Sequence, residues 1–335
     1  MRVNPRYATG LLLAVASVVW WAVGMAVLQP LTEPAGPWSE VLPGNHTYWA
    51  REVRLTALVG IVLGLVLAFG GGRSATRAAL ALGPGWLLAD LAVDRADLAG
   101  WRYVPPLAAV GCLVLAGAVT LLRRRLSVPP DRPPARRTLL VAATVAAVLA
   151  ALGAAVESPT DREPQLRWAG VGTGALMLAL ACGCALAATA GSARPRAGLA
   201  AGLASIGAVT VVGVRLTPPD QAIRAVWAGG VLLVTAVAVL ADARPEGRSV
   251  VSWYAGVAAV TGVGLPVVLL ATDLVQTWLP VGPVLTRLSG NITLSAADTD
   301  TLVTLDGLVT GLVLGTLSAR LAARRPAAAS PVVFR

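Results

Sequence analysis

The sequence predicts an all-α fold, a polytopic membrane bundle of about ten transmembrane helices with both termini in the cytoplasm. Three observations lead to this prediction: 56% of the 335 residues are hydrophobic, the mean hydropathy is +0.73, and long apolar blocks alternate with short charged segments. A soluble domain needs far fewer apolar residues to fill one core. A helix of about 20 apolar residues is long enough to cross the hydrocarbon layer of a bilayer.

The ten apolar blocks follow one another along the chain. The third is the least regular, because "LGPGW" interrupts it and charge begins at Asp90. We take residues 1–322 as a single integral membrane domain of about five helical hairpins, followed by a short cytoplasmic tail at 323–335. The hairpins resemble one another weakly, which either duplication or the common needs of each membrane interface would explain. The predicted helices are 10–29, 53–71, 77–94, 103–122, 138–156, 168–190, 197–214, 223–241, 252–273 and 302–320.

The positions of the Arg residues predict the orientation. All 27 basic residues are Arg, and 18 of them lie in the N-terminus, the tail and alternate connections, together with only three of the 17 acidic residues. Cytoplasmic loops of membrane proteins carry such an excess of positive charge. We therefore place these segments in the cytoplasm of a bacterium, at its plasma membrane, where Arg would contact anionic lipid. The Arg residues lie between apolar blocks, so the net charge of +10 does not indicate a nucleic-acid partner.

The Trp residues indicate the same frame, because the indole ring prefers the headgroup level of a bilayer. Five of them stand next to predicted outer ends of helices. Two long outer connections, 30–52 and 274–301, carry turn-forming Pro and Gly residues and are expected to be loops. The five residues are Trp49, Trp101, Trp168, Trp227 and Trp278.

Acidic side chains inside apolar blocks are the residues that could carry chemistry. Each ionised group there costs about 2.5–3.5 kcal/mol on insertion scales, and such groups are usually functional. Asp90 and Asp94 end the third block, Asp273 ends the ninth, and Asp306 lies in the tenth. We predict that these four residues are coupling or substrate-binding residues.

The stretch "GPGWLLADLAVDRADL" allows two interpretations. If the helix continues past Pro84, Asp90, Asp94 and Asp97 share one face, and three neighbouring carboxylates resist joint ionisation. Such a row could hold a proton or a cation, and a break at the Pro-Gly pair would free nearby carbonyls. In the second interpretation, the helix ends near Asp90 and the later charges form a solvated outer turn.

The last block contains small residues at a spacing of four. Gly307, Gly311 and Gly315 form one stripe along the predicted helix. Such stripes allow close approach of helix backbones in membranes. We predict that this stripe packs inside the bundle, with a dimer contact as the alternative.

Several classes of chemistry have no support in the sequence. One His and three Cys within apolar blocks indicate neither a metal site nor a disulfide framework, and we expect no cofactor. The spacing D-x-x-x-D in "DLAVD" matches one half of a prenyltransferase motif, but no second copy is present, and no hydrolase or nucleotide-binding motif occurs. We therefore expect a protein that is not an enzyme.

Two functional hypotheses remain. The first is a secondary permease or exporter in which Asp90, with Asp273 or Asp306, binds a coupling proton or a cationic substrate. The alternative is a non-catalytic scaffold or assembly partner whose outer loops contact another protein; a homo-oligomer is left open. A cavity lined by one of these Asp residues would favour transport, and a solid bundle with every acid at the outer rim would favour the scaffold.

Overall fold

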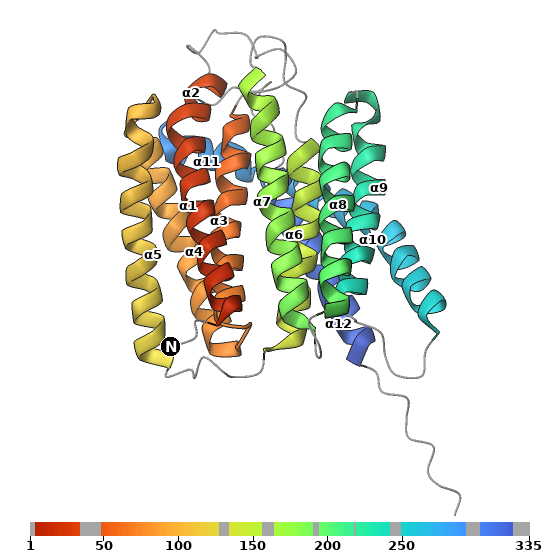
Figure 1. Ribbon diagram of the computed structural model, residues 1–335. Helices are drawn as coiled ribbons and strands as arrows, with labels where there is room; N and C mark the ends of the chain where they lie inside the picture. Colours follow the sequence, from red (N-terminus) through yellow and green to blue (C-terminus); the bar gives the residue numbers. More distant parts are fainter. Residues whose placement is uncertain are drawn as a thin grey trace, which may run out of the picture.

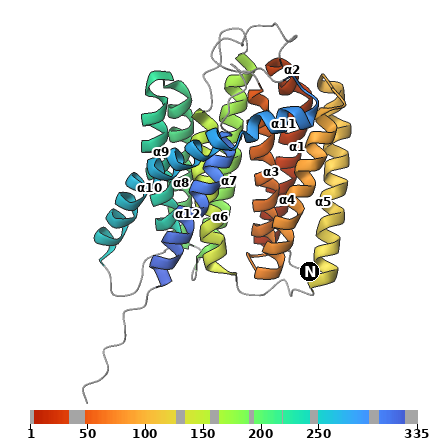
Figure 2. The same ribbon diagram turned by 180° about the vertical axis from the view of Figure 1, so that it is seen from behind.

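The computed structural model describes residues 4–33, 48–126, 134–155, 164–189, 194–217, 219–241, 249–292 and 302–323. Every regular element in these ranges is a helix. The long helices run alongside one another as a bundle (Figures 1 and 2). The fold class predicted from the sequence, a helical bundle, is confirmed for these ranges.

The first predicted helix is one continuous rod of three pieces. The α-helix α1 (Pro5–Val23) is capped by Asn4, whose side chain accepts a hydrogen bond from the amide of Arg6 at 3.1 Å. A π-helical segment, Gly24–Leu28, and the short α2, Gln29–Thr32, extend it. The other helices are α3 (Trp49–Ala68), α4 (Arg73–Asp94), α5 (Val104–Leu126), α6 (Arg136–Ala155), α7 (Pro164–Ala188), α8 (Arg194–Leu216), α9 (Pro219–Leu240), α10 (Val250–Trp278), α11 (Val281–Ser289) and α12 (Val303–Ala323).

Each of the ten predicted blocks coincides with a long helix, but the helices differ in composition. Within the described part of the chain, eight are long and apolar enough to cross a membrane. The exceptions are α3, which carries Arg51, Glu52 and Arg54 near its start, and α4, which combines charged residues with a Gly-Pro-Gly sequence. The eight apolar helices support a multi-pass membrane protein, whereas ten crossings remain a prediction.

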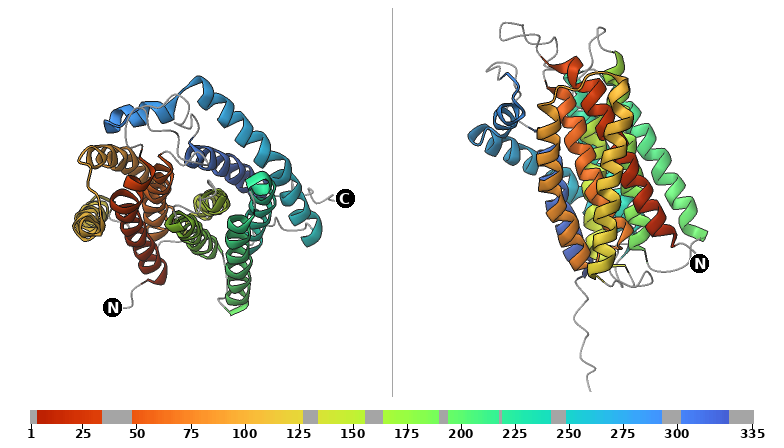
Figure 3. Two further views of the ribbon diagram at one scale, coloured as in Figure 1. Left: turned by 90° about the horizontal axis from the view of Figure 1, so that it is seen from above. Right: turned by 90° about the vertical axis from the view of Figure 1, so that its left-hand side faces the viewer.

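Helix α6 forms the centre of the bundle. It packs against α7, α12, α9, α8 and α3. In its most apolar stretch of 18 residues, 72% of the residues are buried. The corresponding fraction is only 17% for α5 and for α10, which lie at the periphery. Seen along the bundle, α6, α7 and α12 separate a group of α1, α3, α4 and α5 from a group of α8, α9 and α10 (Figure 3).

Glycine sets the closest helix contacts. A Cβ atom added at Gly311 would lie 2.5 Å from the Cα of Val145, and one added at Gly315 would lie 2.9 Å from the Cα of Val141. Gly307 similarly faces the side chain of Leu149. The structure thus places the predicted glycine stripe against α6 of the same chain. Any larger side chain would push α12 away from the bundle centre.

The connections predicted at the outer side contain more helix than expected. The segment predicted as a loop at 274–301 is wrong in part, because α10 continues to Trp278 and α11 follows. The nine residues of α11 end at Gly290, which has a φ of 84° and closes the helix in the left-handed conformation that glycine adopts readily. The stretch resembled a loop because Pro and Gly residues lie within this short helix and at both of its ends.

The two ends of the bundle differ. Helix α1 begins and α12 ends at one end, while α2 and α11 lie at the other (Figure 1). The end with α2 and α11 is the one predicted to be outer. Of the predicted cytoplasmic connections, 242–248 lies outside the described residues, as do parts of 123–137 and 191–196 and the chain from residue 324 onward.

The predicted aromatic belt is only partly consistent with the structure. Trp101, Trp168 and Trp278 are between 69% and 79% exposed. Trp49, in contrast, is buried and packs with the π-helical part of the first rod. Its expected position at a lipid interface is therefore wrong, because α3 enters the bundle with its first turn.

Candidate functional site

Two groups of acidic side chains lie inside the bundle. We call the group of Arg54, Asp90 and Asp94 the paired-acid site, because its carboxylates share a guanidinium partner. We call the second group, in which Asp273 and Asp306 line a hollow, the acid-lined cavity. The structure therefore brings the four predicted residues together in pairs, at separate places.

The paired-acid site depends on the course of α4. This helix runs without interruption from Arg73 through Pro84 to Asp94, so the expected break at the Pro-Gly pair is wrong. After Asp94 the chain turns, and Asp97 adopts a left-handed φ of 51°. Asp90 and Asp94 consequently share one face of α4, whereas Asp97 lies in the exposed turn and does not join them.

Arg54 of α3 binds both carboxylates. Its Nη1 donates to Asp94 Oδ1 at 2.7 Å, and its Nη2 donates to Asp94 Oδ2 at 2.9 Å, which is a bidentate pair. The Nη2 atom also lies 3.3 Å from Asp90 Oδ2. The indole Nε1 of Trp21 donates to Asp90 Oδ1 at 2.7 Å. Arg54 and Asp90 are each only 1% exposed.

These contacts correct both interpretations of the acidic stretch. Asp90 and Asp94 are buried, so the prediction of a solvated outer turn is wrong for them. The prediction of a bare row of carboxylates is also wrong, because the guanidinium of Arg54 offsets their repulsion. Arg54 lies in the predicted block 53–71, and its charge inside an apolar block was the signal that could have identified the partner.

The first rod makes room for Arg54. A Cβ at Gly24 would lie 2.9 Å from the Cγ of Arg54, so glycine lets the arginine stem pass. The Nη1 atom also lies 3.0 Å from the sulfur of Met25, within the π-helical segment. Such segments often accompany functional or strained sites.

The acid-lined cavity has a volume of about 500 Å³. It lies between the end of α6 and helices α9, α10 and α12. Most of its lining is apolar, and the ionisable residues among its described lining are Asp273 of α10 and Asp306 of α12. On its rim, Ile223 and Leu270 are 84% and 69% exposed, so the cavity opens toward the side of the bundle.

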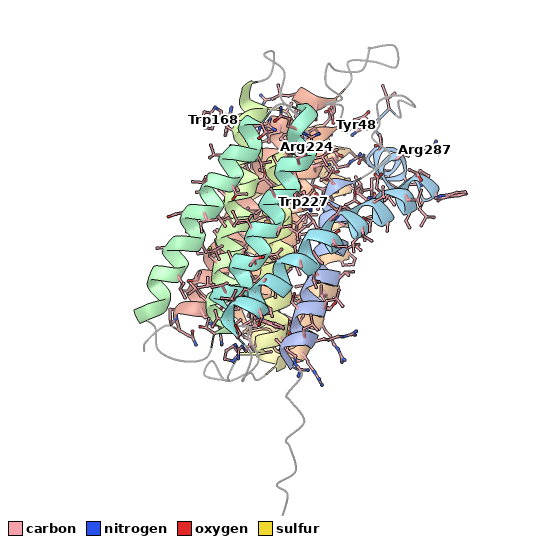
Figure 4. All side chains as sticks on the ribbon, turned by 90° about the vertical axis from the view of Figure 1, so that its right-hand side faces the viewer. Tyr48, Trp168, Arg224, Trp227 and Arg287 are labelled. Atoms are coloured by element: carbon pink, nitrogen blue, oxygen red, sulfur yellow. The ribbon has the colours of Figure 1, made fainter. Side chains whose placement is uncertain are left out.

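A hydrogen bond between α9 and α10 shapes one wall of this cavity. Pro266 interrupts the hydrogen bonding of α10, because it lacks the amide hydrogen that would bind the carbonyl of Gly262. The indole Nε1 of Trp227 donates to that carbonyl at 2.8 Å. Trp227 lies nearer the middle of the bundle than Trp168 and Arg224 (Figure 4). Trp227 was predicted to lie at the headgroup level, but its indole instead bonds to the wall of the cavity.

Gln276 forms hydrogen bonds on the side of the cavity where Asp306 lies. Its Nε2 donates to Asp306 Oδ1 at 2.7 Å, and its Oε1 accepts from the amide of Leu302 at 2.8 Å. Both contacts are buried and join the end of α10 to the start of α12. Asp306 is 8% exposed, whereas Asp273 is partly exposed.

Helix α11 closes the end of the bundle next to the paired-acid site. Arg51 donates to the carbonyl of Gly282 at 3.1 Å and to Oγ1 of Thr286 at 2.7 Å, and Arg95 donates to the carbonyl of Leu288 at 2.6 Å. These bonds fix α11 to α3 and to the end of α4.

Glu33, just after α2, belongs to the same end. It accepts hydrogen bonds from Gln29 at 2.8 Å and from Asn291, beyond α11, at 3.4 Å. Burial raises the pKa of Glu33 above its ordinary value, and the hydrogen bond from Gln29 opposes this shift.

The described residues contain no group of three or more His, Cys, Asp and Glu residues arranged to hold a metal ion. Comparison of the chain with protein-family models, with curated proteins and with solved structures gives no match. In its described residues the chain is all-helical, and its eight long apolar helices support a multi-pass membrane protein.

Proposed function

We propose that this protein is a secondary permease or exporter that binds an amphipathic organic cation in the acid-lined cavity. The observation that carries the proposal is the cavity of about 500 Å³ lined by Asp273 and Asp306. In this proposal the protein lies in a bacterial plasma membrane with both termini in the cytoplasm, as its Arg distribution predicts.

The cavity has the features of a site for such a ligand. Its volume falls in the range of small-molecule sites, about 300–1,000 Å³, and its walls are mostly apolar with few polar groups. Asp273 and Asp306 favour a positively charged ligand, and the indole of Trp227 can stabilise a cation through its π face. The exposed apolar rim favours entry from the lipid, where such molecules concentrate.

The paired-acid site has a different part in this proposal. Asp90 and Asp94 are not among the residues that line the cavity, and both bind Arg54. We therefore assign Asp90 and Asp94 to positioning Arg54 and α4, rather than to contact with the substrate. Asp273 and Asp306 remain as the substrate-binding residues.

Transport in proteoliposomes tests the proposal. Tetraphenylphosphonium, an apolar cation, is the probe, and its flux is measured with imposed pH and voltage gradients. We expect flux through the wild type and its loss in Asp273→Asn and in Asp306→Asn. Asp97→Asn, which removes an exposed carboxylate in a left-handed turn that Asn tolerates, is the matched control. Equal flux in all four proteins would refute the proposal.

The alternative function, a scaffold that contacts another protein at its outer end, has one supporting observation. Val284 and Leu288 of α11 are 46% and 47% exposed at the end of the bundle where α11 lies. A wild-type protein without flux for any organic cation, together with a partner recovered by crosslinking at these two positions, would favour the scaffold.

A further inference from the structure

A second, much smaller cavity lies beside Glu52 of α3. It has a volume of about 10 Å³, enough for one water-sized particle. Residues of α3, α6, α7 and α12 line it, among them Glu52, Thr56, Thr173 and Thr304. A carboxylate and three hydroxyl groups are thus gathered around a space for a single small particle.

Glu52 is buried with one oxygen atom unused. Its Oε2 accepts from the amide of Thr304 at 2.8 Å and from the hydroxyl of Thr304 at 2.7 Å. Its Oε1 is buried and has no hydrogen-bond partner, and the whole residue is only 8% exposed. Burying a carboxylate oxygen without a partner is costly, so a ligand at Oε1 would remove a substantial penalty.

The hydroxyl groups around the cavity have lone pairs to offer. Thr304 uses its hydrogen on Glu52, so Thr56, whose oxygen lies 2.9 Å from that of Thr304, is the donor in their bond. The lone pairs of Thr56 are then free. Thr173 donates to the carbonyl of Ala169 at 2.8 Å and accepts from Trp20 at 2.9 Å, which leaves it one lone pair. Three residues that line the small cavity therefore each keep an unused oxygen lone pair.

The buried charges of three helices, two of which line this cavity, have an excess of acids that favours a cation. Helices α3, α4 and α12 bury two cations, Arg51 and Arg54, against four acids. Arg54 is bound to two of these acids, and Arg51 donates to α11. Glu52 lies within electrostatic range of Arg51 and of Asp306. The four acids are Glu52, Asp90, Asp94 and Asp306.

We propose that Glu52, with the hydroxyl groups of Thr56 and Thr173, forms a Na⁺ site in the small cavity. Hard cations prefer oxygen ligands, and a single carboxylate suits a monovalent ion. Several converging oxygens favour a metal ion over a proton, because a proton needs one carboxylate oxygen and one acceptor. This site goes beyond the expectation from the sequence, which included no metal.

The site is placed to couple ion binding to the acid-lined cavity. Leu152 and Val303 line both cavities, so these two side chains form part of the wall between them. Occupation of the small cavity would also fix the first turn of α12, which carries Thr304 and Asp306. The role of Na⁺ as a coupling ion rests on the proposed function, whereas Na⁺ binding itself does not.

Direct binding of ²²Na⁺ to the purified full chain tests this inference. We expect saturable binding by the wild type that excess unlabelled Na⁺ displaces. Glu52→Gln should abolish it, and Thr56→Val should raise the half-saturating Na⁺ concentration. Asp97→Asn should bind as the wild type does, because its carboxylate lies outside the cavity. Unfolding temperatures measured on the same samples identify any variant that fails to fold. If Glu52→Gln does not fold, the Na⁺ affinity of Thr56→Val decides the test.

Three results would overturn the inference: no saturable ²²Na⁺ binding by the wild type, equal binding by folded Glu52→Gln, or proton uptake by Glu52 without any Na⁺ binding. Saturable Na⁺ binding without flux of an organic cation would leave the Na⁺ site standing and refute the proposed transport. Flux that needs Asp273 but does not change with the Na⁺ concentration would leave the proposed transport standing and refute the role of Na⁺ as its coupling ion.

Discussion

The paired-acid site and the acid-lined cavity contain the same type of residue in opposite surroundings. Asp90 and Asp94 are buried against Arg54, with their oxygens bound at 2.7 to 3.3 Å. Asp273 and Asp306 line a hollow of about 500 Å³, and Gln276 is the neighbour that binds Asp306. A carboxylate bound to a buried arginine stabilises the bundle, whereas one beside an open space is available to a ligand.

The comparison also separates two kinds of helix. α3 and α4 carry most of the buried charges of the described residues and fall outside the set of apolar helices, yet ion pairs join them to each other. α10 is among the apolar helices, but most of its surface is exposed. The buried ion pairs therefore lie between α3 and α4, whereas the acid-lined cavity lies beside the largely exposed α10.

Replacing Arg54 should have the largest effect on stability. Arg54→Met leaves Asp90 and Asp94 buried without their cation, and the loss of one partner of a buried ion pair costs about 3–5 kcal/mol. Unfolding measured in detergent should show this loss, while Arg102→Met, which changes an exposed side chain, should unfold like the wild type. Adding Asp90→Asn and Asp94→Asn to Arg54→Met should restore most of the stability. A stable single variant would mean that the site is not a fixed ion pair.

The glycine stripe should give the next largest effect. Gly311→Ala places a Cβ 2.5 Å from the backbone of Val145, so α12 must shift, at a cost of about 1–3 kcal/mol. Gly256→Ala in α10 meets nothing within 4 Å and should be nearly neutral. Thermal unfolding of both variants makes the comparison. Equal stability would show that α12 does not pack against α6 as closely as the structure describes.

Loss of the indole hydrogen of Trp227 should have a smaller effect. Trp227→Phe leaves the carbonyl of Gly262 without its donor, which costs about 0.5–1.5 kcal/mol and loosens the wall between α9 and α10. Trp168→Phe, at a position 70% exposed, is the control. Hydrogen exchange of α10 after each change would show whether the wall opens, and unchanged exchange would contradict this account.

The pH dependence from Glu33 should be smaller again. The pKa of Glu33 is raised in the folded protein, so its protonated form favours folding. This contribution is complete below the ordinary pKa of a glutamate and is lost as the pH rises through the raised pKa. Glu33→Gln should therefore flatten the stability profile of the wild type over that range. A wild-type profile that instead rises there would reverse the predicted sign.

Neutralising Asp273 should have the least effect on stability. Asp273→Asn changes a partly exposed side chain beside the cavity, so the free energy of unfolding should stay within about 0.5 kcal/mol. Chemical unfolding measured for this variant and for Arg54→Met should give a small and a large loss in the free energy of unfolding, respectively. A large loss of stability would move Asp273 into the class of structural acids.

The sequence predicted the helices well because apolar blocks and charged turns are strong local signals. The third block ends at Asp94 both in the prediction and in the structure. The partner of Asp90 could not be predicted, because Arg54 lies 36 positions earlier and is brought to it only by the packing of α3 against α4. Helix α11 was missed because it is short and Pro and Gly residues also flank it, which resembles a loop.

The cavity shows a second limit of sequence reasoning. Asp273 and Asp306 were identified from their positions in apolar blocks, but nothing in the sequence placed them on one hollow. Glu52 was overlooked, because it is the last residue of the predicted outer connection 30–52, just before the block 53–71. Only the packing of the helices shows that Glu52 lines a small cavity and that one of its oxygens is left without a partner.

Equilibrium binding of two ions of the same shape tests the central claim most directly. Tetraphenylphosphonium and tetraphenylborate differ in the sign of their charge, and both can be titrated onto the purified protein. Our account predicts saturable binding of the cation only, with loss of that binding in Asp273→Asn and no loss in Asp97→Asn. Equal binding of both ions, or cation binding that Asp273→Asn leaves unchanged, would contradict it.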